Sequence, residues 1–147
     1  MQHTKSGRKL SEIIVETFRL NGAIINAGDA LVKDLGLTSA RWQVLSVLFD
    51  EPATVSEIAR RMGLSRQNVQ RIANRLIKDG FIEPVDNPAH RRAKLCSLSA
   101  LGKETMTEVA KRQTLWANEV SNTMDMEKLA IVVSQMKEYR QKILSLC

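Results

Sequence analysis

The chain has 147 residues and a formal net charge of +6, with 22 lysines and arginines against 16 aspartates and glutamates. This length suits one domain, or one domain with an extension, and is enough to bury a core without disulfides or structural metals. The basic balance favours an acidic partner, nucleic acid first and an anionic membrane second. Aromatic residues make up 4% of the chain, which argues against a base-stacking platform for single-stranded nucleic acid.

The two cysteines, Cys96 and Cys147, are too few for a disulfide framework, and neither lies in a CxxC motif or beside a pair of histidines. We therefore expect no metal and no cofactor. The polar N-terminus has no apolar region of the signal-peptide kind, and no apolar run approaches the roughly 18–20 residues needed to span a membrane. These features predict a soluble, cytoplasmic protein with no membrane partner. No glycine-rich phosphate loop or nucleophile–base pair indicates an enzyme.

The first predicted element is a helix over residues 10–34, after a loose polar tail over residues 1–9. Apolar residues recur along it at spacings near three and four, as in an amphipathic helix. Gly22 and Gly28 lie inside it, where each costs roughly 1 kcal/mol relative to alanine. Either they allow another backbone to approach closely or they bend the helix. Gly36 ends it.

The next two predicted helices are short. One covers residues 40–49 after Thr38 and Ser39, which are good capping residues. The other runs from a Ser56 cap to Met62. The residues of the former expected to point inward are Trp42, Leu45, Leu48 and Phe49.

A fourth helix is expected over residues 65–79, with Ser65 as its cap and Gly80 just beyond its end. The apolar period then changes, so residues 81–85 and 93–98 are predicted to form two short strands around a polar loop.

Two long helices are expected to complete the chain. Ser99 caps one over residues 100–122, and Asp125 caps another whose apolar stripe reaches the C-terminus. The predicted organisation is an N-terminal helix over residues 1–36, a helix-turn-helix with a hairpin over 37–99, and terminal helices over 100–147.

The positive charge is concentrated in one part of the chain. Residues 54–94 hold nine basic and four acidic side chains, a net +5, whereas the rest of the chain holds 13 basic and 12 acidic groups. The electrostatic signal of a nucleic-acid surface therefore coincides with the predicted helix-turn-helix and hairpin.

Residues 56–77 carry the pattern of a helix-turn-helix. Ala59 is small enough for two helices to cross closely, Gly63 suits the tight turn, and Val69 packs into the gap between the helices. The opposite face of the second helix carries amides and arginines, with no carboxylate before Asp79.

Asparagine and glutamine can bond to adenine, and arginine to guanine, in the major groove of DNA. The expected base contacts are Gln67, Asn68, Gln70 and Arg71. Arg66 suits either a base or a phosphate, and Ser65 both caps the helix and is a candidate phosphate contact. Asn74 and Arg75 complete the candidate DNA-binding set on this helix.

Two further groups of candidates lie outside this helix. The hairpin loop carries His90, Arg91, Arg92 and Lys94, and an arginine in a narrow minor groove reads its shape and negative potential. The predicted helix N-termini offer Thr38, Ser39 and Ser56 to DNA phosphates.

Several runs of this sequence resemble the MarR (multiple antibiotic resistance regulator) family. They are LT at 37–38, WQVL at 42–45, VSEIA at 55–59, LSRQNV at 64–69, GFIE at 80–83 and DNPAHRRAKL at 86–95. The resemblance covers nearly the whole chain. It implies a mainly α fold, a winged helix-turn-helix of three helices and a β-hairpin wing, with N- and C-terminal helices that interlock in a homodimer.

The resemblance also implies a function. We expect a repressor that binds double-stranded DNA at a pseudo-palindromic operator, with two recognition helices about 34 Å apart. Family members respond to small aromatic carboxylates or phenols, for which Phe18, Trp42 and Trp116 are candidate contacts, or else core residues. A family branch senses oxidants through a cysteine in the first helix, and this chain has none there.

Two alternatives stay open from the residues alone. The chain could be a winged-helix adaptor that binds protein without reading DNA sequence. The two terminal apolar stripes could also be buried within one chain instead of between two.

Overall fold

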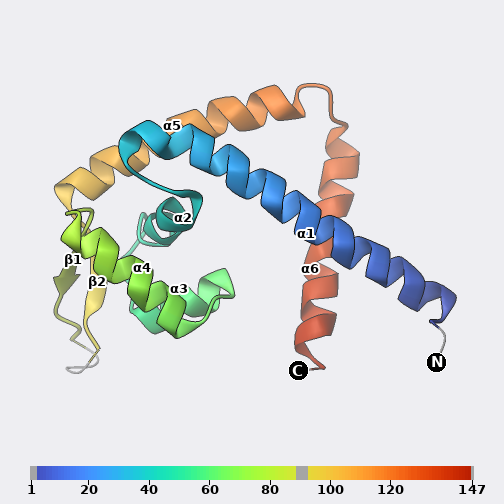
Figure 1. The fold of residues 1–147 in the computed structure, drawn as a ribbon, viewed down its shortest axis with the longest axis horizontal. Helices are drawn as coiled ribbons and strands as arrows, with labels where there is room; N and C mark the ends of the chain where they lie inside the picture. The colour runs from blue at the N-terminus through green and yellow to red at the C-terminus, as the bar shows by residue number, and fades with distance from the viewer. Residues whose placement is uncertain (1–2, 89–92, 147) are drawn as a thin grey trace. The chain divides into compact units, whose positions relative to one another are not determined.

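The computed structural model describes residues 3–88 and 93–146 and has the predicted mainly α, winged helix-turn-helix architecture (Figure 1). One compact unit extends to Ala110, and a second begins at Lys111. In chain order the elements are α1 (Lys5–Val32), the 3-10 turn η1 (Lys33–Leu35), α2 (Ser39–Val47), α3 (Val55–Met62), α4 (Arg66–Lys78), β1 (Ile82–Val85), β2 (Leu95–Leu98), α5 (Ala100–Ser121) and α6 (Met126–Leu144).

Helix α1 starts earlier than predicted. The Thr4 hydroxyl accepts a hydrogen bond from the Gly7 amide at 3.0 Å, which caps the helix ahead of Lys5. The expectation of a loose tail is therefore wrong from Lys5 onward, because this local cap satisfies a helical amide that would otherwise need water. At the other end, Gly36 adopts φ 69°, a left-handed conformation that glycine reaches without strain.

Gly28 marks the crossing of α1 and α2. A Cβ added at Gly28 would lie 2.8 Å from the Ser39 hydroxyl oxygen and 3.4 Å from Nε1 of Trp42. Gly28 therefore gives room to side chains of α2, and the atoms nearest to it are not backbone atoms as the first explanation expected. Gly22 has no such neighbour within 4 Å.

The caps of the short helices differ from those predicted. Thr38 occupies the N-cap position of α2 without a side-chain bond, and the Ser39 amide instead donates to Oδ1 of Asp29 on α1. Helix α3 is capped by Thr54, whose hydroxyl accepts from the Glu57 amide at 3.2 Å, while the Glu57 carboxylate accepts from the Thr54 amide at 2.7 Å. Ser56 is therefore not the cap, because this reciprocal capping box at Thr54 starts the helix two residues earlier.

The core of the first unit lies among α2, α3, α4 and the hairpin. Gly63 turns the chain at φ 65°, as the helix-turn-helix pattern predicted. The inward prediction for Phe49 is wrong, since this side chain is 49% exposed just beyond the end of α2. The largest fully buried side chains are Leu45, Ile58, Leu76, Val32, Val44, Val69 and Ser39.

Strand β2 of the hairpin is paired along both of its edges. Strands β1 and β2 are antiparallel, with Ile82 opposite Leu98. On the other edge of β2, the Cys96 amide donates to the Ala53 carbonyl at 2.8 Å, and the Ala53 amide returns a bond at 3.1 Å. Because β2 is held between β1 and this bridge, the base of the hairpin is fixed against the α2–α3 connection.

The second unit contains the end of α5 and all of α6. The Asp125 carboxylate accepts from the Lys128 amide at 3.1 Å and caps α6, as predicted. The apolar stripe of α6 remains exposed in this chain, at residues Leu129, Val132, Val133, Met136 and Ile143. Within the described ranges, no helix is both long enough and apolar enough to cross a membrane.

Candidate nucleic-acid interface

Helix α4, called the recognition helix below, is fixed by its cap and its buried stripe. The Ser65 hydroxyl accepts from the Asn68 amide at 3.2 Å, as predicted. Val69, Ile72, Ala73 and Leu76 are buried. Because these four residues occupy one side of the helix, the opposite side is left in solvent.

That exposed side carries the recognition face, which we define as Arg66, Gln67, Gln70, Arg71 and Asn74. These five residues line one open hollow of about 620 Å³. Two bonds order its side chains: Gln70 Nε2 donates to Asn74 Oδ1 at 2.9 Å, and Arg71 Nη2 donates to Asn68 Oδ1 at 3.2 Å. The lining contains amides and guanidinium groups and no carboxylate, so it offers hydrogen bonds and positive charge together.

A second groove connects this helix to the hairpin. Its volume is about 310 Å³, and it is lined by Ser56, Arg66, Gln70 and Lys94, together with neighbouring residues of α3 and of both strands. The structure therefore brings together four candidates that the sequence placed on three different elements. This groove suits the negatively charged backbone of a nucleic acid, because Arg66, Lys94 and the first turn of α3 border it.

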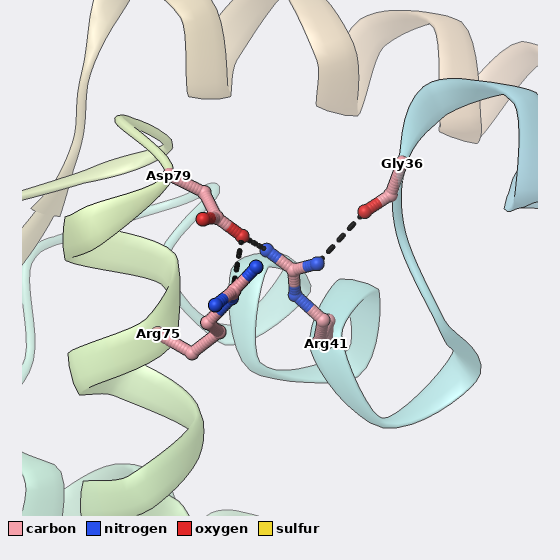
Figure 2. A network of polar contacts seen from close by, with 4 residues as sticks. All are labelled: Gly36, Arg41, Arg75 and Asp79. Carbon is pink, nitrogen blue, oxygen red and sulfur yellow. Dashed lines mark hydrogen bonds and ion pairs between the residues drawn. The ribbon is translucent and has the colours of Figure 1, made fainter.

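Arg75 lies differently from the other candidates on this helix. Its Nε donates to Oδ2 of Asp79 at 3.1 Å, and the same oxygen accepts from Nη2 of Arg41 (Figure 2). Burial acts to raise the pKa of Asp79, but the bond and charge of Arg41, with those of Arg75, lower it overall. Asp79 is therefore ionised at neutral pH and holds part of the Arg75 guanidinium.

Ser39 does not fit the predicted phosphate contact. It is 1% exposed, and its hydroxyl accepts from Gln43 Nε2 at 3.1 Å. A buried and engaged hydroxyl does not meet a phosphate, so this prediction is wrong. Thr38, the neighbouring candidate, is exposed.

The structure describes one of the four candidates on the wing. His90, Arg91 and Arg92 lie outside the described residues, so their contacts with DNA stay predictions. Lys94, at the base of the hairpin, is exposed and lines the second groove.

Two of the three aromatic candidates, Phe18 and Trp42, lie apart within the first unit. Phe18 is 71% exposed on α1, ten residues before Gly28, which amounts to about 15 Å along a helix. Trp42 is half-buried beside Gly28, and its Nε1 is a buried donor without a hydrogen-bond partner within residues 3–88 and 93–146. Trp116 belongs to the second unit. Phe18 and Trp42 are therefore separated, and Trp42 is the one with an unused polar group.

Cys96 is buried on β2, and burial raises the pKa of its thiol. A thiol in this position packs as an apolar side chain and is poorly reactive. Cys147 lies outside the described residues. Among the residues that the structure describes, no three histidine, cysteine or carboxylate side chains are grouped to hold a metal ion.

Sequence reasoning missed Arg41. It lies on α2, and its partner Asp79 is 38 residues away at the end of the recognition helix. Neither residue stands out in a periodic pattern, and only the folded chain brings the two side chains together. The sequence offered one signal, since Asp79 is a carboxylate that directly follows a predicted helix whose exposed face carries no carboxylate.

The chain was compared with known proteins. Residues 35–93 match the model of the MarR family. A protein of Mycobacterium tuberculosis (strain ATCC 25618 / H37Rv), named Uncharacterized protein Rv2011c, is 34% identical over 117 residues, which cover 80% of this chain and 82% of that protein.

Two solved structures have the same fold. AbsC, a MarR family transcriptional regulator from Streptomyces coelicolor, superposes with a TM-score of 0.81 over 99% of each chain at 17% identity. A structure of reduced AbfR bound to DNA superposes with a TM-score of 0.74 at 17% identity, over 93% of this chain and 95% of that one.

The local sequence runs, the helix-turn-helix with its hairpin, and these matches agree with one another. The expectation that the chain is not an enzyme follows from this kinship with transcription regulators. The chain belongs to the MarR family of winged helix-turn-helix transcriptional regulators.

Proposed function

We propose that this protein regulates transcription by binding double-stranded DNA in a sequence-specific manner, with the recognition face in the major groove. The observation that carries the proposal is the recognition face itself, whose five exposed amide and guanidinium side chains line one hollow without a carboxylate. Such groups match the hydrogen-bonding edges of adenine and guanine. The groove lined by Ser56, Arg66 and Lys94 is the proposed path of a DNA strand.

The proposed active species is a homodimer on a pseudo-palindromic site. The terminal helices carry many exposed apolar side chains, and such side chains indicate an interaction surface, since large apolar patches are rare on monomers. On α1 the exposed apolar side chains are Leu10, Ile13, Ile14, Val15, Phe18, Leu20, Ile24 and Ile25. Together with the stripe of α6, they support interlocking of the terminal helices of two copies. Two recognition helices would then read half-sites one helical turn apart.

The proposed mode of regulation is repression, which a small aromatic or phenolic effector relieves. Trp42 supports an effector contact on α2, because its buried Nε1 donor lacks an acceptor among the described residues. A carboxylate or phenol oxygen would supply that acceptor, and an unmade buried bond costs free energy. Phe18 and Trp116 are weaker candidates. The proposed role in transcription also implies that the chain works in the cytoplasm, where the DNA of such cells lies.

The experiment that tests the proposed function is a salt titration of duplex binding. A duplex selected by the wild-type chain from a random-sequence library is compared with a scrambled duplex of the same composition. Sequence-specific regulation predicts tighter binding to the selected duplex at every salt concentration, with both affinities falling as salt rises. Equal affinity for the two duplexes would contradict the proposal and favour a winged-helix adaptor that binds protein.

A further inference from the structure

Arg41 lies where three segments of the first unit meet (Figure 2). Its Nη1 donates to the Gly36 carbonyl at 2.8 Å, and its Nη2 donates to Oδ2 of Asp79. Its guanidinium carbon lies 5.7 Å from the centre of the Phe81 ring. Gly36 belongs to the turn before α2, Asp79 caps the end of the recognition helix, and Phe81 precedes β1. One side chain therefore ties the turn after α1 to the recognition helix and to the start of the hairpin.

This ion pair is shielded from water. The Arg41 and Asp79 side chains are 16% and 23% exposed, whereas those of the Arg61–Glu51 pair are 43% and 61% exposed. The Nε of Arg41 is buried and has no hydrogen-bond partner in the part of the chain that the structure describes, so Gly36 and Asp79 supply the hydrogen bonds of the guanidinium. Breaking a shielded pair leaves the remaining charge only partly compensated by water and by other protein groups.

The position of Asp79 is otherwise unfavourable. A carboxylate at the C-terminal end of a helix is repelled by the partial negative charge of the last carbonyls. It also adds negative charge to a helix whose proposed partner is anionic. Its two arginine partners account for its presence, since Oδ2 accepts from both Arg41 and Arg75.

We propose that Arg41 and Asp79 are positioning residues for DNA recognition. Their ion pair fixes the C-terminal end of the recognition helix against the turn that follows α1, and so sets the orientation in which the recognition face meets the major groove. Neither residue needs to touch DNA. This proposal rests on the proposed function, and it adds residues outside the recognition face on which sequence discrimination depends.

The test uses Asp79→Asn in the full-length chain, with the selected and scrambled duplexes described above. Asparagine keeps the size of the side chain and removes its charge. We expect affinity for the selected duplex to fall roughly five- to thirty-fold, which corresponds to misalignment of about one base contact. Affinity for the scrambled duplex should stay the same or rise, because the variant is less negative. A simple charge effect predicts that both affinities rise, so the two explanations differ in sign.

Arg41→Lys is the second variant, and it keeps the protein testable if Asp79→Asn does not fold. Lysine retains the charge but lacks the planar fork that joins the Gly36 carbonyl to Asp79. It should lose part of the discrimination between the two duplexes. Glu51→Gln is the matched control, because it breaks an arginine–carboxylate pair of α3 that does not reach the recognition helix. It should leave the ratio of the two affinities unchanged.

The outcomes separate this proposal from the one on which it rests. If the wild-type chain prefers the selected duplex and the folded Asp79→Asn and Arg41→Lys variants keep the same preference, the positioning role is overturned, whatever their melting temperatures. A lower melting temperature with an unchanged ratio of affinities would make the pair purely structural. If the wild-type chain itself shows no preference, the proposed function fails and this proposal fails with it.

Discussion

The exposed side chains of the recognition helix hold one another in place in the absence of a partner. Arg71 donates to Asn68, and Gln70 donates to Asn74, each pair spanning about one turn. Exposed bonds of this kind contribute little to folding, since water competes for both partners. Their consequence is geometric, because they orient the remaining donors of Arg71 and Gln70 along the open side of the helix.

Arg71→Ala is expected to weaken binding to the selected duplex by about 1–3 kcal/mol, because the proposed bond between its guanidinium and a base is lost. Binding to a scrambled duplex should change much less. The measurement is a titration of both duplexes at one salt concentration, with Lys78→Ala, at the end of the same helix, as the control. Equal weakening on both duplexes would make Arg71 a phosphate contact.

Cys96 is the residue for which burial gives the clearest chemical expectation. Burial raises the pKa of its thiol, so the reactive thiolate is scarce at neutral pH, and the surrounding core limits access. In a Cys147→Ser variant, the remaining thiol should react slowly with a thiol reagent in the native protein and rapidly in denaturant. Fast reaction of the native variant would show that β2 opens readily or that Cys96 is an accessible thiol.

At the scale of elements, the helix-turn-helix begins with different residues than the pattern suggested. Helix α3 begins with the reciprocal bonds of Thr54 and Glu57, and bonding to the Thr54 backbone and hydroxyl lowers the pKa of Glu57. Ser56, two residues after Thr54, is exposed and lines the groove beside the hairpin. The cap and the candidate phosphate contact are thus separate residues.

Thr54→Ala and Ser56→Ala form a matched pair that separates these roles. Thr54→Ala should lower the free energy of unfolding by about 1 kcal/mol, because the helix loses its cap. Ser56→Ala should change it by no more than about 0.5 kcal/mol, as expected for an exposed site. Chemical denaturation measures both, and duplex binding by Ser56→Ala then tests the groove. A larger stability loss for Ser56→Ala would contradict the assigned cap.

At the scale of the whole molecule, charge and apolar surface occupy different segments. Residues 54–94 carry nearly all of the net charge, whereas α1 and α6 present exposed apolar side chains. Both α1 and α6 are amphipathic, and many of their apolar side chains are exposed to solvent in a single chain. This distribution supports the proposal that residues 54–94 bind DNA and that α1 and α6 bind a second copy of the chain.

Phe18→Glu should shift the protein from dimer to monomer, because a carboxylate at an interface of apolar side chains is costly to desolvate. Sedimentation across a range of concentrations measures this shift, and circular dichroism checks that the helices remain. Phe49→Glu is the control, since Phe49 is also an exposed phenylalanine but lies just after α2. A wild-type chain that sediments as a monomer at all concentrations would contradict the homodimer.

The sequence by itself determined the features that depend on near neighbours. Helix periods, the Gly63 turn, the caps Ser65, Ser99 and Asp125, and the charge-bearing face of α4 all arise within four residues along the chain. Local backbone and side-chain bonds control such features, so a pattern in the sequence is enough to predict them. The errors at Ser56 and at the start of α1 were also local, because several good capping residues stand close together.

Only the tertiary structure decided which side chains meet across the chain. It buried Ser39 at the crossing with Gly28, joined Cys96 to Ala53, and paired Arg41 with Asp79. These contacts depend on how helices cross and where turns direct them, and neither is encoded in a local period. The sequence therefore indicated the surface proposed to read DNA, and the packing of α1, α2 and α4 decided which residues contact the end of the helix that carries it.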